Sequence, residues 1–293
     1  MERVGVVGLG IMGTAYARNL ITAGHQVVGF DVAAGPLEAL ADLGGHPAGS
    51  CAEVAGVCDV VLIALPSVSA LRETVTGPDG LIEGAGRGQV VVEMSTLPIE
   101  DKVWAKTELT SAGAILLDAP VSGTGIQADA GEIVVYASGD REAIERVRPV
   151  FAVLARASYD LGEFGNGSKM KFVANLLVSV HNLATAEALN MGIAGGLEPA
   201  QILEVISAGV GSSRIFEIRG PMIVADEFPP AARLEMFLKD IAVIGEFGRS
   251  IGVPTPLLDA SLPWYREAVE QGLGDLDAAA LSRLLRAKKA RGG

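Results

Sequence analysis

The first half of the chain alternates between short apolar runs and stretches with a helical pattern of polar and apolar positions. The apolar runs are rich in valine and isoleucine and occupy residues 4–7, 26–30, 59–64, 90–93 and 114–117. Continuous apolar runs of this length are typical of parallel strands that are buried on both faces. Further strands are predicted at residues 133–136 and 157–159, separated by a helix over residues 141–154. The pattern therefore predicts an α/β domain with a doubly wound sheet that extends to about residue 163.

After residue 163 the strand pattern stops, and helical patterns continue to the end of the chain. One long helix is predicted from Ser168 to about Ala194, a stretch without proline in which Gly192 is the one glycine. Its length of about 27 residues corresponds to about 40 Å. Other helices are predicted over residues 199–208, 234–250 and 278–289. We therefore expect an α/β domain, residues 1–163, and an all-helical domain, residues 164–293.

The long predicted helix is apolar on most faces, which is typical of a helix buried between other elements. Its first turns nevertheless carry Lys171 and Asn175, which are four residues apart and therefore lie on one face. A structural interpretation is that the Lys171 ammonium extends to solvent and Asn175 bonds to backbone. The alternative is that the ammonium and the carboxamide act together in a functional site.

A glycine-rich turn follows the first predicted strand directly and leads into a helix. Its G-x-G-x-x-G pattern consists of Gly8, Leu9, Gly10, Ile11, Met12 and Gly13. In such a turn the first glycine permits the tight bend, the second lets backbone approach a pyrophosphate, and the third lets the helix pack against the strand. The free N–H groups of the helix start then bind the phosphates. We predict a dinucleotide-binding site, the alternative being a glycine-rich turn in an unrelated α/β protein.

An acidic residue, Asp31, ends the second predicted strand, 18 residues after Gly13. At this place a carboxylate accepts a hydrogen bond from the 2′-hydroxyl of the adenosine ribose in NAD. An NADP site instead needs an arginine or lysine for the 2′-phosphate, and residues 32–36 contain neither. Because the Asp31 carboxylate would also repel that phosphate, the sequence favours NAD over NADP.

Polar or glycine-rich residues follow the later strands as well. Leu65-Pro66 comes after the third strand, Ser95-Thr96 after the fourth, and residues 118–125 after the fifth. Ligands of parallel sheets bind beyond the carboxyl ends of the strands. These segments are therefore expected to meet at one crevice.

Composition excludes several classes of partner. The net charge of −12 over 293 residues argues against nucleic acid. No run of about 18 uncharged apolar residues occurs, so we expect no membrane span, and the N-terminus enters the first strand without the pattern of a signal peptide. The two cysteines, Cys51 and Cys58, suit a reducing cytoplasm, and with three scattered histidines they predict no metal site.

Taken together, these motifs resemble those of the β-hydroxyacid dehydrogenases, the family of 3-hydroxyisobutyrate dehydrogenase and tartronate semialdehyde reductase, which is related to 6-phosphogluconate dehydrogenase. The resemblance covers nearly the whole chain and implies an N-terminal Rossmann domain joined by the long helix to an all-helical domain. Besides the motifs above, it rests on Asp118-Ala119-Pro120-Val121-Ser122-Gly123, Gly165-Asn166-Gly167, Glu187-Ala188, Lys239-Asp240, Gly272 and Asp277.

The resemblance also implies roles for individual residues. Lys171 is expected to be the catalytic lysine, with Asn175 as its substrate-binding neighbour. Ser122 and Gly123 are expected to hold the substrate carboxylate. The cofactor contacts that it adds are Leu65, Pro66, Thr96 and Lys239.

Three departures from the family pattern bear on the substrate. Thr124 follows Ser122-Gly123 where many members have glycine, Tyr16 stands where methionine is common, and Arg214 adds a cation to a region that shapes the substrate pocket in relatives. We expect Thr124, and the amide of Gln127 nearby, to favour a substrate with an extra hydroxyl group, because an aliphatic acid would leave these groups unpaired.

The expected reaction is hydride transfer between a small β-hydroxy acid and NAD. A lysine in a partly desolvated site can have its pKa lowered enough to accept the proton of the substrate hydroxyl. The alternatives are an imine reductase of the same fold, in which this lysine is typically replaced, and a dinucleotide-binding sensor or scaffold that has lost it. Lys171, Asn175 and Ser122 favour the dehydrogenase. The apolar surface of the helical half, and the resemblance, predict a homodimer or homotetramer.

Overall fold

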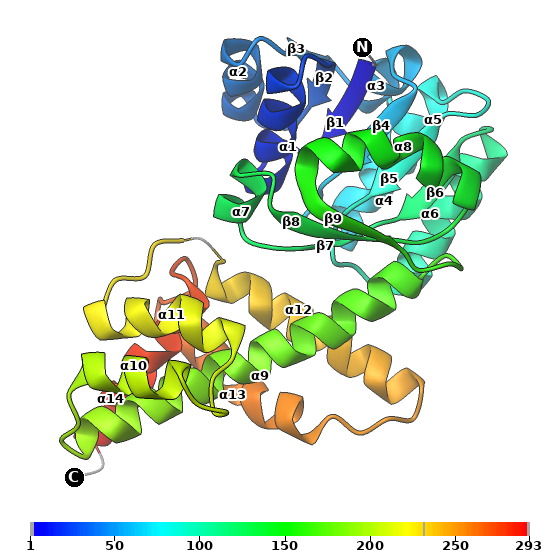
Figure 1. Cartoon of the computed structure of the whole chain (residues 1–293). Coiled ribbons are helices and arrows are strands. Elements are labelled where there is room, and N and C mark those ends of the chain that lie inside the picture. Colours follow the sequence, from blue (N-terminus) through cyan, green and yellow to red (C-terminus); the bar gives the residue numbers. More distant parts are fainter. Residues whose placement is uncertain (1–2, 231, 292–293) are drawn as a thin grey trace. The chain divides into compact units, whose positions relative to one another are not determined.

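The computed structural model describes residues 3–230 and 232–291 of the chain. Contacts divide the chain into two compact units, residues 1–171 and 172–293. Helix α9 (Asn166–Ala194) contributes to both units, because the division falls within it (Figure 1). The boundary expected from the sequence, between residues 163 and 164, lies just ahead of this helix.

A sheet of six strands forms the centre of the first unit (Figure 1). In spatial order its strands are β3 (His46–Pro47), β2 (Gln26–Phe30), β1 (Arg3–Val7), β4 (Val60–Ile63), β5 (Val90–Glu93) and β6 (Ile115–Asp118). Every neighbouring pair is parallel. From β1 the chain first adds β2 and β3 on one side, and then adds β4, β5 and β6 on the other side. The predicted doubly wound sheet is therefore confirmed.

Helices cover both faces of this sheet, because successive strand residues point to opposite sides. On β4, Val60 and Leu62 pack into the apolar cluster that includes α1 (Ile11–Thr22), α8 (Arg141–Leu154) and Leu40 of α2 (Ala34–Asp42). Val61 and Ile63 pack into a second cluster on the other face. The helices of that cluster are α3 (Cys51–Val57), α4 (Val68–Thr76), α5 (Leu81–Gly84) and α6 (Ile99–Ser111).

The last strands of the α/β unit form a separate sheet, which the sequence pattern did not predict. It consists of β7 (Val121–Ser122), β8 (Ile133–Ala137) and β9 (Ala155–Asp160), with α7 (Gly125–Asp129) between β7 and β8. Pro120 has no N–H with which to continue the ladder of β6, and the chain after it pairs antiparallel with β8 instead. A single bridge between Asp118 and Ser138 connects the two sheets.

The second unit is all helical, as predicted. After α9 it contains α10 (Pro199–Ser207), α11 (Arg214–Ala225), α12 (Leu234–Ser250), α13 (Pro256–Glu270), the 3₁₀ turn η1 (Ala278–Ala280) and α14 (Leu281–Arg291). The sequence pattern did not predict α11 and α13. Each contains an internal proline, Pro221 or Pro263, which interrupts the expected helical pattern.

Helix α9 is long and apolar enough, by length and composition alone, to cross a membrane, and 44% of its most apolar window is buried in the structure. Two of its residues have well-defined partners inside the helical unit. Asn182 donates to the Tyr265 hydroxyl at 3.1 Å, and Phe172 packs against Phe247 with ring centroids 5.2 Å apart. These contacts are those of a core helix of a folded domain.

A buried polar network stabilises the helical unit. Arg219 donates to Asp277 through Nε at 2.7 Å and to Asn182 at 2.9 Å, and its side chain is only 4% exposed. Asp277 also accepts the N–H groups of Ala232 and Ala279. Asp277 therefore holds the segment before α12 and the start of η1 against α11.

We expect Arg219→Ala to destabilise the helical unit by about 3–5 kcal/mol, because it leaves the Asp277 carboxylate buried without its cation. Urea unfolding followed by the fluorescence of Trp264, in a Trp104→Phe background, measures this effect. The matched control is Arg249→Ala, which breaks the exposed pair with Glu246 and should cost less than about 1 kcal/mol. Equal losses in the two variants would contradict the prediction.

Candidate active site

Two glycines of the glycine-rich turn are required by the packing of the protein itself. Gly8 has a φ of +85°, and a Cβ there would collide with the carbonyl oxygen of Ala64 at the end of β4. A Cβ on Gly13 would collide with the carbonyl oxygen of Gly8. Absence of side chains at these two positions lets α1 start close to the strand ends.

Gly10 is different, because a Cβ built on it would meet nothing within 4 Å. Gly10 is also the N-cap of α1, where no side chain caps the helix and the first turn holds no acidic residue. The first N–H groups of a helix need acceptors, and they attract anions. An open, uncapped helix start with a bare backbone fits the pyrophosphate of a dinucleotide, since protein packing does not explain the glycine.

The Asp31 carboxylate lies beside this turn. Its Oδ2 accepts the N–H of Leu9 at 2.7 Å, and its Oδ1 accepts the N–H of Ala33 at 2.9 Å. Asp31 therefore ties the glycine-rich turn to the end of β2. Each carboxylate oxygen can accept a further hydrogen bond, so the residue is placed to receive a ribose hydroxyl.

The other predicted cofactor contacts of this unit lie at the ends of β4 and β5. Leu65, which is half-buried, and Pro66, which is exposed, follow β4 after one residue, Ala64. The Leu65 N–H donates to Ser95 Oγ at 2.8 Å, and Thr96, half-buried, follows Ser95. The segments Leu65-Pro66 and Ser95-Thr96 are thus joined at the edge of the sheet where the glycine-rich turn lies.

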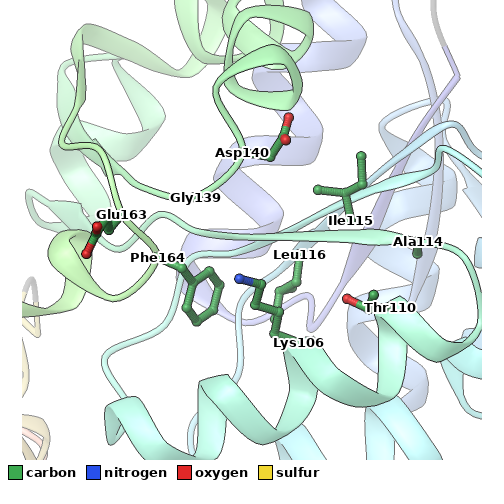
Figure 2. A pocket seen from close by; sticks show the side chains of 9 residues that line it. All are labelled: Lys106, Thr110, Ala114, Ile115, Leu116, Gly139, Asp140, Glu163 and Phe164. Carbon is green, nitrogen blue, oxygen red and sulfur yellow. The ribbon is translucent and has the colours of Figure 1, made fainter.

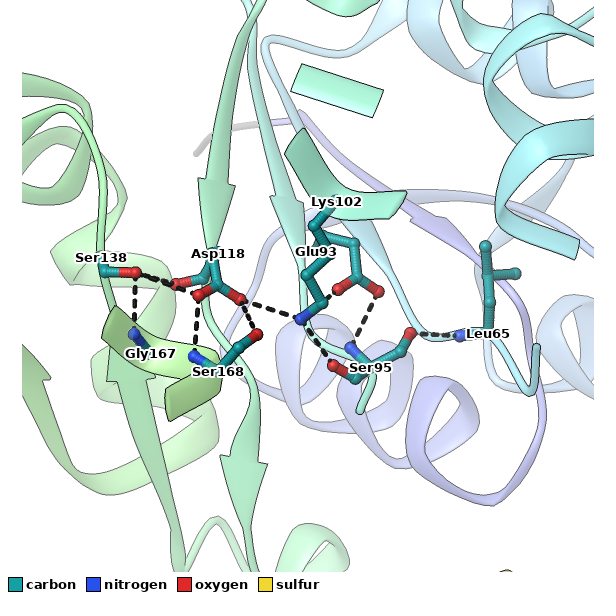
Figure 3. A network of polar contacts seen from close by, with 8 residues as sticks. All are labelled: Leu65, Glu93, Ser95, Lys102, Asp118, Ser138, Gly167 and Ser168. Carbon is teal, nitrogen blue, oxygen red and sulfur yellow. Dashed lines mark hydrogen bonds and ion pairs between the residues drawn. The ribbon is translucent and has the colours of Figure 1, made fainter. Parts of the chain in front are cut away.

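A fully buried ion network lies behind these strand ends, and the sequence analysis missed it. Lys102 Nζ lies 2.6 Å from Glu93 Oε2 and 2.8 Å from Asp118 Oδ1, and all three side chains have no exposed area (Figure 3). Burial alone would lower the pKa of Lys102, but the charges of Asp118 and Glu93 outweigh it and raise that pKa. The sequence held a signal for the two carboxylates, because two predicted strands end in Glu93 and Asp118, which are register partners in the sheet.

The predicted substrate contacts follow β6. Ser122, half-buried, ends β7, and Gly123 has a φ of +148° that favours glycine. Thr124 is the N-cap of α7, and its N–H donates to Gln127 Oε1 at 2.9 Å, as in a capping box. The Gln127 amide oxygen therefore caps a helix, which weakens our expectation that it binds substrate.

Helix α9 begins on the same strand ends. Ser168, which is 1% exposed, donates through its N–H and its hydroxyl to the two carboxylate oxygens of Asp118. Lys171 lies one turn further along and is half-buried, whereas Lys169 is exposed and donates to Asn166 Oδ1. The two lysines thus differ in their surroundings, as their spacing predicts.

In the helical unit, Asn175 and Lys239 gather around one carboxylate. Asn175 Nδ2 donates to Asp240 Oδ2 at 2.7 Å, and Lys239 Nζ lies 3.5 Å from Asp240 Oδ1. Asn175 and Asp240 are both buried, and Asp240 Oδ1 has no hydrogen-bond partner within the described part of the chain. Asp240 was part of the motif in the sequence, but its bond to Asn175 was not predicted.

Two further departures from the family pattern, Tyr16 and Arg214, lie in different surroundings. Tyr16 is 1% exposed, and burial, with the charge of Glu93, raises its pKa well above the usual value. Arg214 is exposed and pairs with Glu217 at 3.0 Å on the surface of α11. Tyr16 therefore packs behind the strand ends, while Arg214 is held by a neighbour on its own helix.

A hollow of about 590 Å³ also lies on the α/β unit, between α6 and the first residues of β6. Figure 2 shows Lys106 and Phe164 on one side of it and Asp140 above. Lys106 Nζ lies 4.9 Å from the centre of the Phe164 ring. The hollow borders Ala114 to Leu116, whereas the predicted site residues follow the carboxyl ends of the strands, so it is not part of the candidate site.

Two family models match the chain. The NAD binding domain of 6-phosphogluconate dehydrogenase matches residues 3–162. The NAD-binding domain of NADP-dependent 3-hydroxyisobutyrate dehydrogenase matches residues 165–285. Together they cover both units and agree with the fold.

Individual proteins are similar over nearly the whole chain. L-threonate dehydrogenase of Cupriavidus necator is 33% identical over 284 residues, which are 97% of this chain and 96% of that protein. The chloroplastic glyoxylate/succinic semialdehyde reductase 2 of Arabidopsis thaliana is 30% identical, over 98% of this chain and 80% of that protein. The crystal structure of 3-hydroxyisobutyrate dehydrogenase from Salmonella typhimurium superimposes with a TM-score of 0.87 at 30% identity, covering 97% of this chain and all of that one.

The chain thus combines three features: an open start of α1 beside Asp31, the segments at the strand ends, and a lysine on α9. It is similar over nearly its whole length to known dehydrogenases. The protein belongs to the NAD(P)-dependent β-hydroxyacid dehydrogenase family, as the resemblance in its sequence motifs predicts.

Proposed function

We propose that the protein oxidises a small, hydroxylated β-hydroxy acid with NAD, and that Lys171 exchanges the proton. The proposal rests on the observation that the open start of α1 and Lys171 belong to the same compact unit. Gly10 leaves the start of α1 open for a dinucleotide, and the half-buried Lys171 stands one turn into α9 in that unit. The proposed substrate contacts, Ser122 and Gly123, lie in the same unit, after β6, the last strand of the six-stranded sheet.

Each group has a definite part in the proposed reaction. A bound NAD supplies the hydride acceptor. The backbone amides at the start of α1 bind the pyrophosphate, and Asp31 accepts a ribose hydroxyl. The Ser122 hydroxyl and the Gly123 N–H donate to the substrate carboxylate. As the substrate C–H bond breaks and the hydride leaves, Lys171 Nζ accepts the hydroxyl proton, and in the reverse direction it returns that proton.

The further contacts that we propose are Asn175, for the substrate, and Leu65, Pro66, Thr96 and Lys239, for the cofactor. Asn175 Nδ2 donates to Asp240, which fixes the orientation of the carboxamide. Thr124 is proposed to contact an additional substrate hydroxyl. The name of the relative L-threonate dehydrogenase refers to a polyhydroxylated acid, which supports this class of substrate.

We propose a reducing compartment, the cytoplasm, as the site of action, although one plant relative is chloroplastic. Cys51 and Cys58 are free and buried. Burial raises the pKa of Cys51 to about 11 and that of Cys58 to about 12. Both thiols therefore stay protonated and unreactive at neutral pH.

The direct test is a panel of acids that includes 3-hydroxyisobutyrate, glycerate and threonate, with NADH formation as the measurement. We expect the hydroxylated acids to give the higher kcat/KM. Lys171→Ala should lower kcat by about 10²- to 10⁴-fold, the usual contribution of a positioned general acid or base, and should leave the Kd for NAD nearly unchanged. Lys171→Arg should not restore activity, because a guanidinium cannot accept the proton.

Lys169→Ala is the matched control, since Lys169 lies on the same turn but is exposed. It should retain wild-type kcat. Substantial activity in Lys171→Ala, or loss of activity in Lys169→Ala instead, would show that the wrong lysine has been assigned. Reduction of cyclic imines in place of acid oxidation would support the imine reductase alternative.

NAD should be preferred over NADP in kcat/KM, chiefly because NADP binds more weakly beside the Asp31 carboxylate. Asp31→Asn removes the charge but keeps an acceptor for the Leu9 N–H, so it should narrow the preference by about tenfold or more. Binding titrations with both cofactors measure the change. Equal or better activity of the wild type with NADP would refute the proposal.

We propose that the protein forms a homodimer or homotetramer through its helical unit. Large apolar side chains of that unit are exposed, among them Val173, Leu177, Met191, Val205 and Leu257. Exposed apolar surface on this scale is typical of an interface. Light scattering at micromolar concentration should give a dimer or larger assembly, and a monomer would contradict this.

A further inference from the structure

The buried ion network of Glu93, Lys102 and Asp118 has two arms, and the first reaches the cofactor-binding segments. Glu93 Oε1 accepts the N–H of Ser95 at 2.9 Å, and Lys102 Nζ donates to the carbonyl oxygen of Ser95 at 2.7 Å. Ser95 Oγ in turn accepts the N–H of Leu65 at 2.8 Å (Figure 3). The network therefore fixes the backbone of Ser95 from both sides and, through its hydroxyl, the start of Leu65-Pro66.

The second arm reaches the start of α9. Asp118 Oδ2 accepts the N–H of Ser168 at 2.8 Å, and Asp118 Oδ1 accepts the Ser168 hydroxyl at 2.7 Å. Ser138 Oγ accepts the N–H of Gly167 at 2.9 Å and itself donates to Asp118. Two of the N–H groups that a helix start leaves without intrahelical acceptors are thus satisfied by this network.

The net charge of the network is favourable beside the start of α9. One ammonium and two carboxylates leave a net negative charge. At the positive end of α9 the Ser168 N–H donates to the Asp118 carboxylate, and the Gly167 N–H donates to Ser138 Oγ, whose hydroxyl donates to that carboxylate. A group of charged residues this deeply buried is not an efficient way to stabilise a core, since apolar residues of similar volume often do so better. Its contacts instead run to the two elements that carry the proposed chemistry.

We propose that Glu93, Lys102 and Asp118 form a positioning network that holds the start of α9, and with it Lys171, in register with the Ser95 and Leu65 segments that bind the cofactor. None of the three touches the reacting atoms. They act through Ser168 on one side and through Ser95 on the other. The inference rests on the proposed role of Lys171 as the proton acceptor.

Both carboxylate oxygens of Asp118 face donors, namely Lys102, the N–H and hydroxyl of Ser168, and the hydroxyl of Ser138. An amide nitrogen at this position would face a donor whichever way it turned. Removal of Lys102 would leave two carboxylates buried without a cation. Variants of these ionised residues are therefore expected to unfold, and the two serines at the ends of the arms provide the cleaner test.

Ser168→Ala should lower kcat by about 5- to 30-fold and leave the Kd for NAD within about twofold, because a small displacement of a reacting group is costly to the rate. Ser95→Ala should raise the Kd for NAD by about 5- to 15-fold, the effect of one lost hydrogen bond, with a much smaller change in kcat at saturating NAD. The Kd values come from NAD titrations and the kcat values from the preferred acid. The control is Ser261→Ala, which removes an equally buried hydroxyl in α13 and should change neither parameter more than about twofold.

A purely structural role would not produce this separation, in which one variant changes kcat and the other changes the Kd for NAD. A kcat within twofold of the wild type in Ser168→Ala would overturn the proposal, as would equal changes of both parameters in the two variants. Hydrogen exchange of the Gly167 and Ser168 amides gives a readout without turnover, and Ser168→Ala should speed that exchange by about tenfold or more. Unchanged exchange in Ser168→Ala would overturn the positioning role. If exchange is faster but the Lys171→Ala variant remains active, the result would count against the proposed role of Lys171 and not against the positioning of the start of α9.

Discussion

Two carboxylates that end adjacent strands in register repel each other in a protein interior unless a cation lies between them. Glu93 and Asp118 are such a pair, and Lys102 of α6 supplies the cation. The ends of β5 and β6, the first turn of α6 and the first turn of α9 all depend on this arrangement. The carboxyl edge of the sheet is consequently a fixed frame rather than a row of independent loops.

The sequence predicted the parts of the fold that depend on a repeating pattern. Apolar runs marked five of the six strands of the central sheet, and the absence of proline marked α9. The edge strand β3 was not predicted, because its two residues, His46 and Pro47, form no apolar run. The sheet of β7, β8 and β9 was not predicted as a separate layer, because its strands look like any others and the change of direction depends on Pro120 and on one bridge, Asp118 to Ser138. Pairing partners are a property of tertiary contacts, which a strand's own residues do not specify.

The same distinction applies to the candidate site. The glycine-rich turn and Asp31 could be found because the proposed dinucleotide site requires a fixed spacing along the chain. Lys102 could not, since it lies in a helix between Asp101 and Val103 and its partners are 9 and 16 residues away on two strands. The structural interpretation of Asn175 in the sequence was that its side chain bonds to backbone. Its buried partner is instead the side chain of Asp240, which the sequence pattern could not indicate.

Gly167 also constrains the length of the chain between the strand ends and Lys171. A side chain at this position would collide with the carbonyl oxygens of Tyr136 and Asp118, so α9 can rest on the strand ends only with a glycine at its second residue. One residue inserted between Lys171 and this glycine would turn the lysine by about 100° around the helix axis. For Lys171 to act as proposed, the segment of five residues from Gly167 to Lys171 must therefore keep its length.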